Sequence, residues 1–387
     1  MVKAIKVMLI PNNVQKTKMF QYAGASRFAY NWALAREIEN YEKGGKFLSD
    51  AELRKEFTKL RHSDEYAWLL SISNNVTKQA IKDACTAYKN FFKGLQKFPR
   101  FKSKKRSMPK FYQDNVKIRF SNTHVKFEGF SSSRKANKQK MNWVRLAEHG
   151  SIPTDAKYMN PRISFDGLNW WISVCVEFPD CRETLNDDGV GIDLGIKDLA
   201  ICSDGTKYKN INKSQKVKKL EKQKRRLQRS ISRSYEKNKK GESYCKTNNV
   251  IKKEKLLLKR NHRLTNIRKN YLNQTISEIV NRKPRFICIE DLNVSGMMKN
   301  RHLSKAVQAQ GFFWFRKQLE YRCSDKGIQL IVADRFYPSS KLCSCCGNIK
   351  KDLKLSDRVY RCACGNMIDR DFQASINLKT YGEKFAS

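Results

Sequence analysis

The chain has 387 residues, enough for roughly two to four domains, and its 40% hydrophobic and 11% aromatic content is typical of globular proteins. Its formal net charge of +42, from 79 basic and 37 acidic residues, opposes a compact fold unless a polyanion neutralises it, and nucleic acid is the obvious partner. No apolar run approaches the ~20 residues of a membrane-spanning helix and no signal peptide is recognisable, which argues against membrane and secreted classes and predicts a cytoplasmic protein.

The N-terminal part is predicted to begin with a strand at residues 2–9 and to continue as a helical section. Its clearest helix covers about residues 75–93, where apolar side chains recur on one stripe. The polar first turn carries Asn75, Lys78 and Gln79, and Asn and Gln can pair with adenine, so this helix end could read a DNA groove. Helix capping accounts for these polar residues about as well.

The segment FPRFKSKKRSMPKFY interleaves aromatic and basic side chains in a stretch broken by prolines. This composition suits a phosphate backbone with stacked bases, and a solvated linker is the alternative. The basic residues that we single out as nucleic-acid contacts are Arg100, Lys102, Lys104 and Lys105.

Beyond this segment, alternating apolar residues predict several short antiparallel strands, with a hairpin that closes at Asp166-Gly167. Several strands within about 70 residues suggest a small barrel. The strand at residues 2–9 would complete the barrel, and the helical section would be an insertion into it. The polar stretch 180–189 is predicted to link the barrel to the next domain.

The second half opens with GVGIDLGIKDLA, residues 189–200, which predicts two successive strands with Asp193 near the end of the first. Aspartate is a poor strand former, and the flanking glycines let a large group approach the backbone, although an exposed loop Asp is the alternative. The strongly basic region from about 210 to 269 predicts two long helices. With almost no compensating acids it favours a phosphate-binding surface over a solvated face, and we single out Arg225 and Arg226 there.

A short buried strand at residues 286–289 ends at Glu290. An acid at the C-terminal end of a central strand is costly to bury and is commonly functional in open α/β sheets. One amphipathic helix is predicted over Ser304–Lys326, and another strand follows it. Near the C-terminus, Asp369 and Asp371 precede a final helix, where an acid is most often an N-cap.

A cysteine-rich segment lies before this final helix, whereas most of the other cysteines, of twelve in all, are scattered singly as in a reducing cytoplasm. Two cysteine pairs on glycine-containing turns are typical of a structural four-thiolate zinc site. Cys345 is an alternative to Cys343, and the second pair is C-x-C rather than C-x-x-C. The predicted ligands are Cys343, Cys346, Cys362 and Cys364.

Asp193, Glu290 and Asp371 fall at the edges of one presumed sheet. Converging carboxylates repel each other and need cations between them, and an oxygen-rich ligand set suits Mg²⁺ or Mn²⁺. Two such ions activate water and stabilise the leaving oxygen in phosphodiester cleavage. Since no nucleophile elbow is present, the sequence predicts a metal-dependent nuclease on a basic scaffold.

The stretches GIDLGIKDLA, IEDLNV and SSKLCSCCG…CACG…DRDFQASINL resemble the signature of the TnpB family, the transposon-encoded RNA-guided DNA endonucleases related to type V CRISPR effectors. RFAYNWAL, AYKNFF and FPRFKSKK extend the resemblance over nearly the whole chain. The resemblance implies an α/β multidomain protein with a RuvC-like RNase H nuclease domain, whose catalytic and metal-binding residues are Asp193, Glu290 and Asp371 with two Mg²⁺ or Mn²⁺ ions. It also implies an inserted zinc ribbon with one zinc ion, a small antiparallel β-barrel (wedge) and an inserted helical recognition lobe.

The resemblance makes Asp369 a neighbour of the metal site rather than a principal ligand. Two departures, Gln373 in place of the more common Asn and the shortened Cys362/Cys364 pair, touch no metal-binding carboxylate. The expected partners are a guide RNA from the transposon end and target double-stranded DNA beside a short adjacent motif, in a prokaryotic cytoplasm. The alternatives are a transposase that joins strands, a guide-bound repressor that does not cut, and a zinc-ribbon binding protein without catalysis.

The same resemblance divides the chain into six expected segments. These are the first barrel strand at 1–12, the recognition lobe at 13–105, the wedge at 106–183, the nuclease domain with its long basic helices at 184–335, the zinc ribbon at 336–367, and the last RuvC motif and helix at 368–387.

Overall fold

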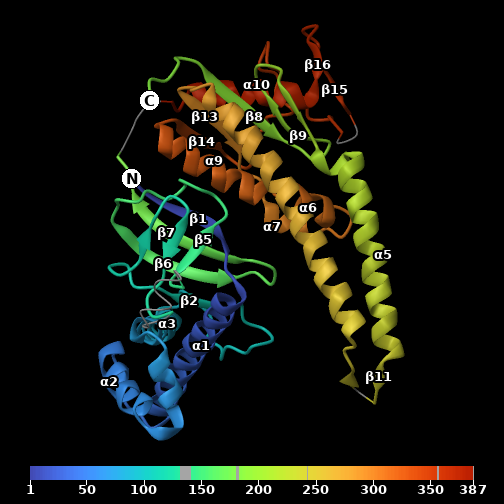
Figure 1. Ribbon diagram of the computed structural model, residues 1–387. Coiled ribbons are helices and arrows are strands. Elements are labelled where there is room, and N and C mark those ends of the chain that lie inside the picture. Colours follow the sequence, from blue (N-terminus) through green and yellow to red (C-terminus); the bar gives the residue numbers. More distant parts are fainter. Residues whose placement is uncertain (131–140, 180–182, 242, 355–356, 387) are drawn as a thin grey trace. The chain divides into compact units, whose positions relative to one another are not determined.

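The computed structural model describes residues 1–130, 141–179, 183–241, 243–354 and 357–386 (Figure 1). The chain divides into two compact units, Met1–Pro179 and Asp180–Ser387, and each unit has its own hydrophobic core. The first three residues of the predicted link at 180–189 lie outside the described residues. Among the helices that the structure describes, none has the length and apolar character needed to cross a bilayer.

The helices of the first unit pack around a long N-terminal helix, α1. An Asn12 capping box starts α1, because the Asn12 side chain accepts from the Gln15 backbone while the Gln15 side chain accepts from the Asn12 backbone. The predicted helix at 75–93 is confirmed as α3, which packs along α1. The helices are α1 (Asn13–Glu42), α2 (Asp50–Arg61), the 3₁₀ helix η1 (Asp64–Ser71) and α3 (Asn74–Phe92).

The first unit also contains a seven-stranded antiparallel sheet in the order β2-β6-β7-β1-β5-β4-β3. The predicted first strand is confirmed as β1, which lies inside this sheet between β7 and β5, and the predicted hairpin turns at Gly167, whose φ is +94°. The strands are β1 (Val2–Ile10), β2 (Lys110–Tyr112), β3 (Arg119–Phe120), β4 (His124–Lys126), β5 (Trp143–Leu146), β6 (Tyr158–Phe165) and β7 (Trp170–Glu177).

The predicted barrel is not closed by backbone hydrogen bonds, because no ladder joins the edge strands β2 and β3 within the described residues. Side chains bring the two ends of the sheet together instead. The rings of Phe111 in β2 and Phe127 after β4 have centroids 6.5 Å apart, and the Glu128 backbone N–H donates to the Gln113 side chain at 2.9 Å. The sheet therefore curls around a core that its two ends share.

The second unit is built on a five-stranded sheet in the order β10-β9-β8-β13-β14. Its centre is parallel, because β13 runs parallel to both β8 and β14, whereas β9 and β10 are antiparallel. The predicted strands around Asp193 and before Glu290 are confirmed. The strands are β8 (Gly189–Leu194), β9 (Asp198–Cys202), β10 (Lys207–Lys209), β13 (Phe286–Glu290) and β14 (Gln329–Ala333), with the separate ribbons β11 (Lys239–Lys240) with β12 (Ser243–Tyr244) and β15 (Val359–Arg361) with β16 (Met367–Asp369).

Two long basic helices, α5 and α6, lie side by side, as the sequence predicted (Figure 1). The prediction of one helix over Ser304–Lys326 was wrong, because Gly311 adopts a φ of +70° and ends α8 before α9 begins. Only glycine adopts this left-handed conformation without a steric cost. The helices are α5 (Gln215–Lys237), α6 (Asn248–Asn281), α7 (Val294–Lys299), α8 (Ser304–Gln310), α9 (Phe312–Lys326) and α10 (Arg370–Glu383), with the 3₁₀ helix η2 at Ile211–Lys213.

The last helix, α10, packs directly on β8 at Gly191. A Cβ at this position would lie 2.0 Å from the carbonyl oxygen of Ser375 and 2.3 Å from the backbone nitrogen of Lys379. At the other end of α10, Gly382 lies against Phe286 and Cys288 of β13. The N-terminal turn of α10 is therefore held over the C-terminal end of β8.

We predict that Gly191→Ala destabilises the second unit by about 1–3 kcal/mol, because the new methyl group meets backbone atoms that no side-chain rotation can move. The midpoint of thermal unfolding measures this effect. Gly24→Ala in α1 is the matched control: its Cβ meets nothing within 4 Å, and alanine is favoured over glycine in a helix by about 1 kcal/mol. Equal midpoints for Gly191→Ala and the wild type would contradict the close packing of α10 on β8.

Candidate active site and metal centre

The three predicted acids lie at one end of the central sheet of the second unit. The strands β8 and β13 are parallel, with Ile192 opposite Ile289, so the next residues, Asp193 and Glu290, sit side by side where both strands end. Asp371 lies in the first turn of α10, which packs over that end of β8. All three side chains are partly buried. The structure thus brings together acids from three separate segments of the chain.

The electrostatics of these acids reflect their proximity. Burial raises the pKa of Asp193 well above its ordinary value, and the negative charges of Glu290 and Asp371 raise it further. Burial also raises the pKa of Glu290, with Asp371 adding to the shift and a hydrogen bond from the Ser339 hydroxyl opposing it. The negative charges of Glu290 and Asp371 therefore make it harder for Asp193 to ionise.

Asp369 and Asp371 have different local roles although they are two residues apart. The Asp369 side chain caps α10, with its Oδ1 accepting from the backbone N–H groups of Asp371 at 3.1 Å and Phe372 at 3.0 Å. The Asp371 carboxylate instead pairs with Arg370 at 3.4 Å and raises the pKa of Asp193 more than Asp369 does. The capping interpretation thus holds for Asp369, while Asp371 faces the other acids.

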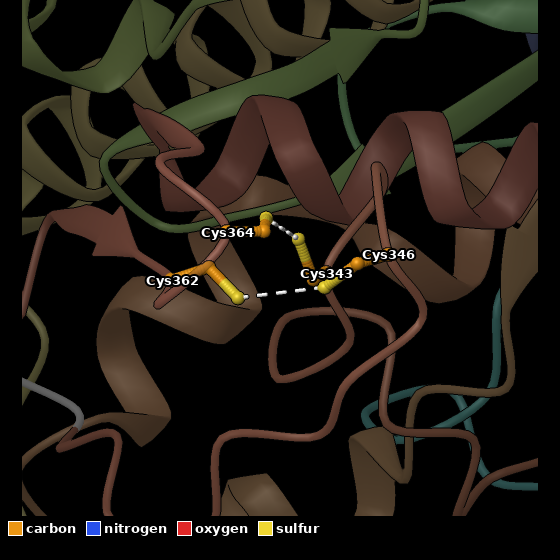
Figure 2. Close-up of side chains that lie close together, drawn as sticks. All are labelled: Cys343, Cys346, Cys362 and Cys364. Atoms are coloured by element: carbon orange, nitrogen blue, oxygen red, sulfur yellow. Dashed lines mark hydrogen bonds between the residues drawn. The ribbon is translucent and has the colours of Figure 1, made fainter.

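Four cysteines form a compact cluster in the ribbon, and their sulfur atoms all lie within 4.8 Å of one another. Figure 2 shows the four side chains turned toward a common centre, with Sγ atoms 3.7 Å apart for Cys343 and Cys364 and 3.6 Å apart for Cys346 and Cys362. Sulfurs arranged tetrahedrally at ~2.3 Å from a zinc ion would be about 3.8 Å apart. The four thiolates therefore fit a structural zinc ion. No other group of three or more such ligands is this compact in the described part of the chain, so the carboxylates lie less close together.

The two knuckles of the ribbon have matching backbone geometry despite their different spacing. Gly347 and Gly365 have φ values of +74° and +90°, and their N–H groups donate to the carbonyls of Cys343 and Cys362. Burial alone would raise the pKa of the Cys343 thiol, but hydrogen bonds from the backbone of Cys346, from the Asn366 amide and from the backbone of Cys345 hold it at about 6. The Cys345 side chain lies outside the cluster, so Cys343 is the better ligand.

Sequence reasoning missed the residues that connect the ribbon to the acids. The Gln373 amide, buried in α10, donates to the Leu342 carbonyl at 2.8 Å and accepts from Asn366 at 2.9 Å. Asn377 donates to the Ser339 carbonyl at 2.7 Å, and the Ser339 hydroxyl donates to Glu290. These contacts join segments far apart in sequence, and no periodicity or spacing signals them.

The predicted base-reading amides in α3 are engaged inside the first unit. Asn75 Nδ2 donates to Glu128 at 3.1 Å, and Gln79 Nε2 donates to Asp83 at 2.9 Å, whereas the Lys78 side chain is exposed. The carboxylate occupies one N–H donor of each amide and so competes with a base for that amide.

The predicted basic contacts before β2 differ in exposure. The Lys102 ammonium lies 3.0 Å from the centroid of the Tyr30 ring. Burial, together with the positive charge of the nearby Lys110, lowers the pKa of Lys102 to about 7. The side chains of Arg100, Lys104 and Lys105 are exposed.

Arg225 and Arg226 line the wall of a large cavity in the second unit. The cavity has a volume of about 800 Å³ and is bounded by α5, α6 and α8. Its other cationic lining residues are Lys218, Lys222, Arg229, Arg268 and Lys305.

Comparisons with known proteins agree with this architecture. The OrfB_IS605 family model, described as "Probable transposase", matches residues 173–301, and the "Helix-turn-helix domain" model of OrfB_IS605 matches residues 1–46. A third model, described as "Cas12f1-like, TNB domain", matches residues 312–378. The structure of a Cas12f1-sgRNA-target DNA complex is similar with a TM-score of 0.55 and 12% identity, over 98% of both chains. The fold and its cysteine ribbon thus define a protein built like the Cas12 effectors.

Two relatives identify the family. The Escherichia coli K12 protein named "Putative RNA-guided DNA endonuclease InsQ" is 30% identical over 379 residues, which cover 93% of this chain and 87% of that protein. A Streptomyces pristinaespiralis protein named "Putative RNA-guided DNA endonuclease" is 28% identical over 98% of this chain and 89% of its own length. The chain belongs to the TnpB family, as its motifs predicted.

We predict that Cys362→Ser removes the bound zinc, because three thiolates and a hydroxyl no longer complete the tetrahedral site. Elemental analysis of the purified protein should fall from about one zinc ion per chain to well below that, with faster proteolysis of the ribbon. Cys345→Ser, which changes an exposed cysteine outside the cluster, should keep the ion. Full zinc content in Cys362→Ser would contradict the assigned ligand set.

Proposed function

We propose that this chain is an RNA-guided double-stranded DNA endonuclease of RuvC type that cuts target DNA beside a short adjacent motif. Asp193, Glu290 and Asp371 are its catalytic and metal-binding residues. The observation that carries the proposal is the convergence of these three acids, in which burial and mutual repulsion raise the pKa of Asp193 and Glu290. Repulsion between neighbouring carboxylates destabilises the folded protein, and a cation bound between them removes this repulsion. Acids with pKa values perturbed in this way are typical of functional sites.

The donor set fits Mg²⁺ or Mn²⁺, because every ligand in it is a carboxylate oxygen and the three charges together attract a hard cation. When bound, two such ions would activate water and stabilise the leaving oxygen of a phosphodiester. The protein's own residues prepare the site. The Ser339 hydroxyl holds Glu290, and the capped N-terminus of α10 fixes Asp371. The cysteine cluster, by contrast, would hold one zinc ion with a structural role.

The partners that we propose are a guide RNA from the transposon end and the target DNA. Both relatives described above carry the name "Putative RNA-guided DNA endonuclease". The net charge of +42 favours a large polyanionic partner, and the basic cavity beside α5 offers a surface for its phosphates. In this proposal residues 13–105 form the recognition lobe, 1–12 and 106–183 the wedge, 184–335 with 368–387 the nuclease domain, and 336–367 the zinc ribbon.

The same proposal assigns nucleic-acid contacts in both units. Arg225 and Arg226 would bind phosphates in the basic cavity of the second unit. Arg100, Lys102, Lys104 and Lys105, which precede β2, would bind phosphates on the first unit. Asn75 and Gln79 would read bases after exchanging their present carboxylate partners. The full set is Asn75, Lys78, Gln79, Arg100, Lys102, Lys104, Lys105, Arg225 and Arg226.

A transposase is the second candidate, because the family model over residues 173–301 is described as "Probable transposase". The same three carboxylates would serve strand transfer. Joining of a labelled transposon end to a target plasmid by the purified protein would favour this function, and cleavage without joining would favour the endonuclease.

We predict that Asp193→Asn, Glu290→Gln and Asp371→Asn each abolish Mg²⁺-dependent cleavage of a guide-matched plasmid, because each change removes a charge that holds the cation. RNA should still copurify with these variants. Asp369→Asn is the matched control and should keep most of the activity, since asparagine caps a helix about as well as aspartate does. Cleavage at the wild-type rate by Asp193→Asn would rule out the proposed active site.

A further inference from the structure

A second cavity of the second unit, with a volume of about 240 Å³, lies beside Glu290. The ends of β8 and β13 contribute Leu194 and Ile289, and α9 contributes Phe312 and Phe313. The remaining wall comes from Leu292 and Asn293 after β13, from the first two residues of α7, and from two arginines. The lining is thus mostly apolar, although one of its members is a proposed catalytic acid.

Phe313 is unusual among the aromatic residues of α9. The side chains of Phe312 and Phe315 are 2% and 0% exposed and belong to the core, whereas Phe313 is 64% exposed and lies outside it. Leaving a phenylalanine in water forgoes most of the free energy that its burial would contribute. An exposed ring on the wall of a cavity is therefore well suited to stack on a flat ligand.

The two arginines of the cavity share one acid, and Arg316 also pairs with Glu320 at 3.2 Å. Arg316 and Arg335 bind the two different oxygens of Asp291, the residue directly after Glu290, and Arg316 lies 2.7 Å from Oδ1. Because Asp291 neutralises part of their charge, this cavity attracts a phosphate less strongly than the basic cavity beside α5 does. Guanidinium groups fixed in this way offer hydrogen-bond donors to the edge of a base.

We propose that this cavity binds one unpaired DNA base next to the phosphodiester that is cut, with the base stacked on Phe313. The inference rests on the proposed function and deepens it. A flat ring, an apolar lining and nearby hydrogen-bond donors match a nucleobase. Glu290 lines the same cavity, so a base bound there would lie beside one of the three proposed catalytic acids. A base held in a duplex is already stacked and paired, so the site selects a single strand.

The first test is the rate of guided cleavage in Phe313 variants. Phe313→Ala should lower the rate on intact DNA by roughly tenfold to a hundredfold, the range expected for loss of one base–aromatic stack. Phe313→Trp should keep the rate, and Phe313→Leu, which is apolar but not aromatic, should resemble alanine. Tyr321→Ala is the matched control, because Tyr321 is a 43% exposed aromatic residue of the same helix outside the cavity.

The second test uses targets that carry one abasic site at each position around the cut. The wild type should lose activity at one position, and Phe313→Ala should show no further loss there, because the stack is already absent. Independent losses, or a wild-type rate in Phe313→Ala, would overturn this inference alone. Absence of cleavage by the wild-type protein on every guided target would overturn the proposed function together with it.

Discussion

The contact between the backbones of β8 and α10 at Gly191 determines where the acids of the second unit meet. Because no side chain separates the helix from the strand there, the first turn of α10 lies over the end of β8. The parallel pairing of β8 with β13 supplies the other constraint, since it aligns Asp193 with Glu290. Three segments that are distant in sequence therefore bring their carboxylates to one place. The stability that the hydrophobic core of the unit provides offsets the repulsion between these carboxylates.

The cysteine-containing segment also helps to position the acids, through hydrogen bonds to α10 and to Glu290. Gln373 and Asn377 of α10 bond to the backbone around the first knuckle, and Ser339 in the same segment donates to Glu290. A zinc ion bound by the four cysteines would stiffen this segment, which has little core of its own. Zinc would thus influence the acids through hydrogen bonds, without lying among them.

The sequence predicted those features that depend on local pattern. The strand before Glu290 follows from its run of apolar residues, the two long helices from their periodic leucines, and the zinc ligands from cysteine spacing. The break at Gly311 was missed because an isolated glycine does not interrupt an amphipathic pattern, and its left-handed φ appears only in the structure. The hydrogen bonds of Ser339 to Glu290 and of Gln373 to Leu342 were missed because they join residues that are 49 and 31 positions apart in the sequence. The edges of the first-unit sheet meet through side chains, which strand periodicity alone cannot predict.

The central claim is that Asp193, Glu290 and Asp371 share a divalent cation. The most direct measurement is anomalous X-ray scattering from crystals of the protein soaked in Mn²⁺, with zinc at the four cysteines as an internal reference at its own absorption edge. We predict manganese density between the three carboxylates of the wild type and its loss in Asp193→Asn. A zinc signal at the cysteines with no manganese at the carboxylates of the wild type would contradict it.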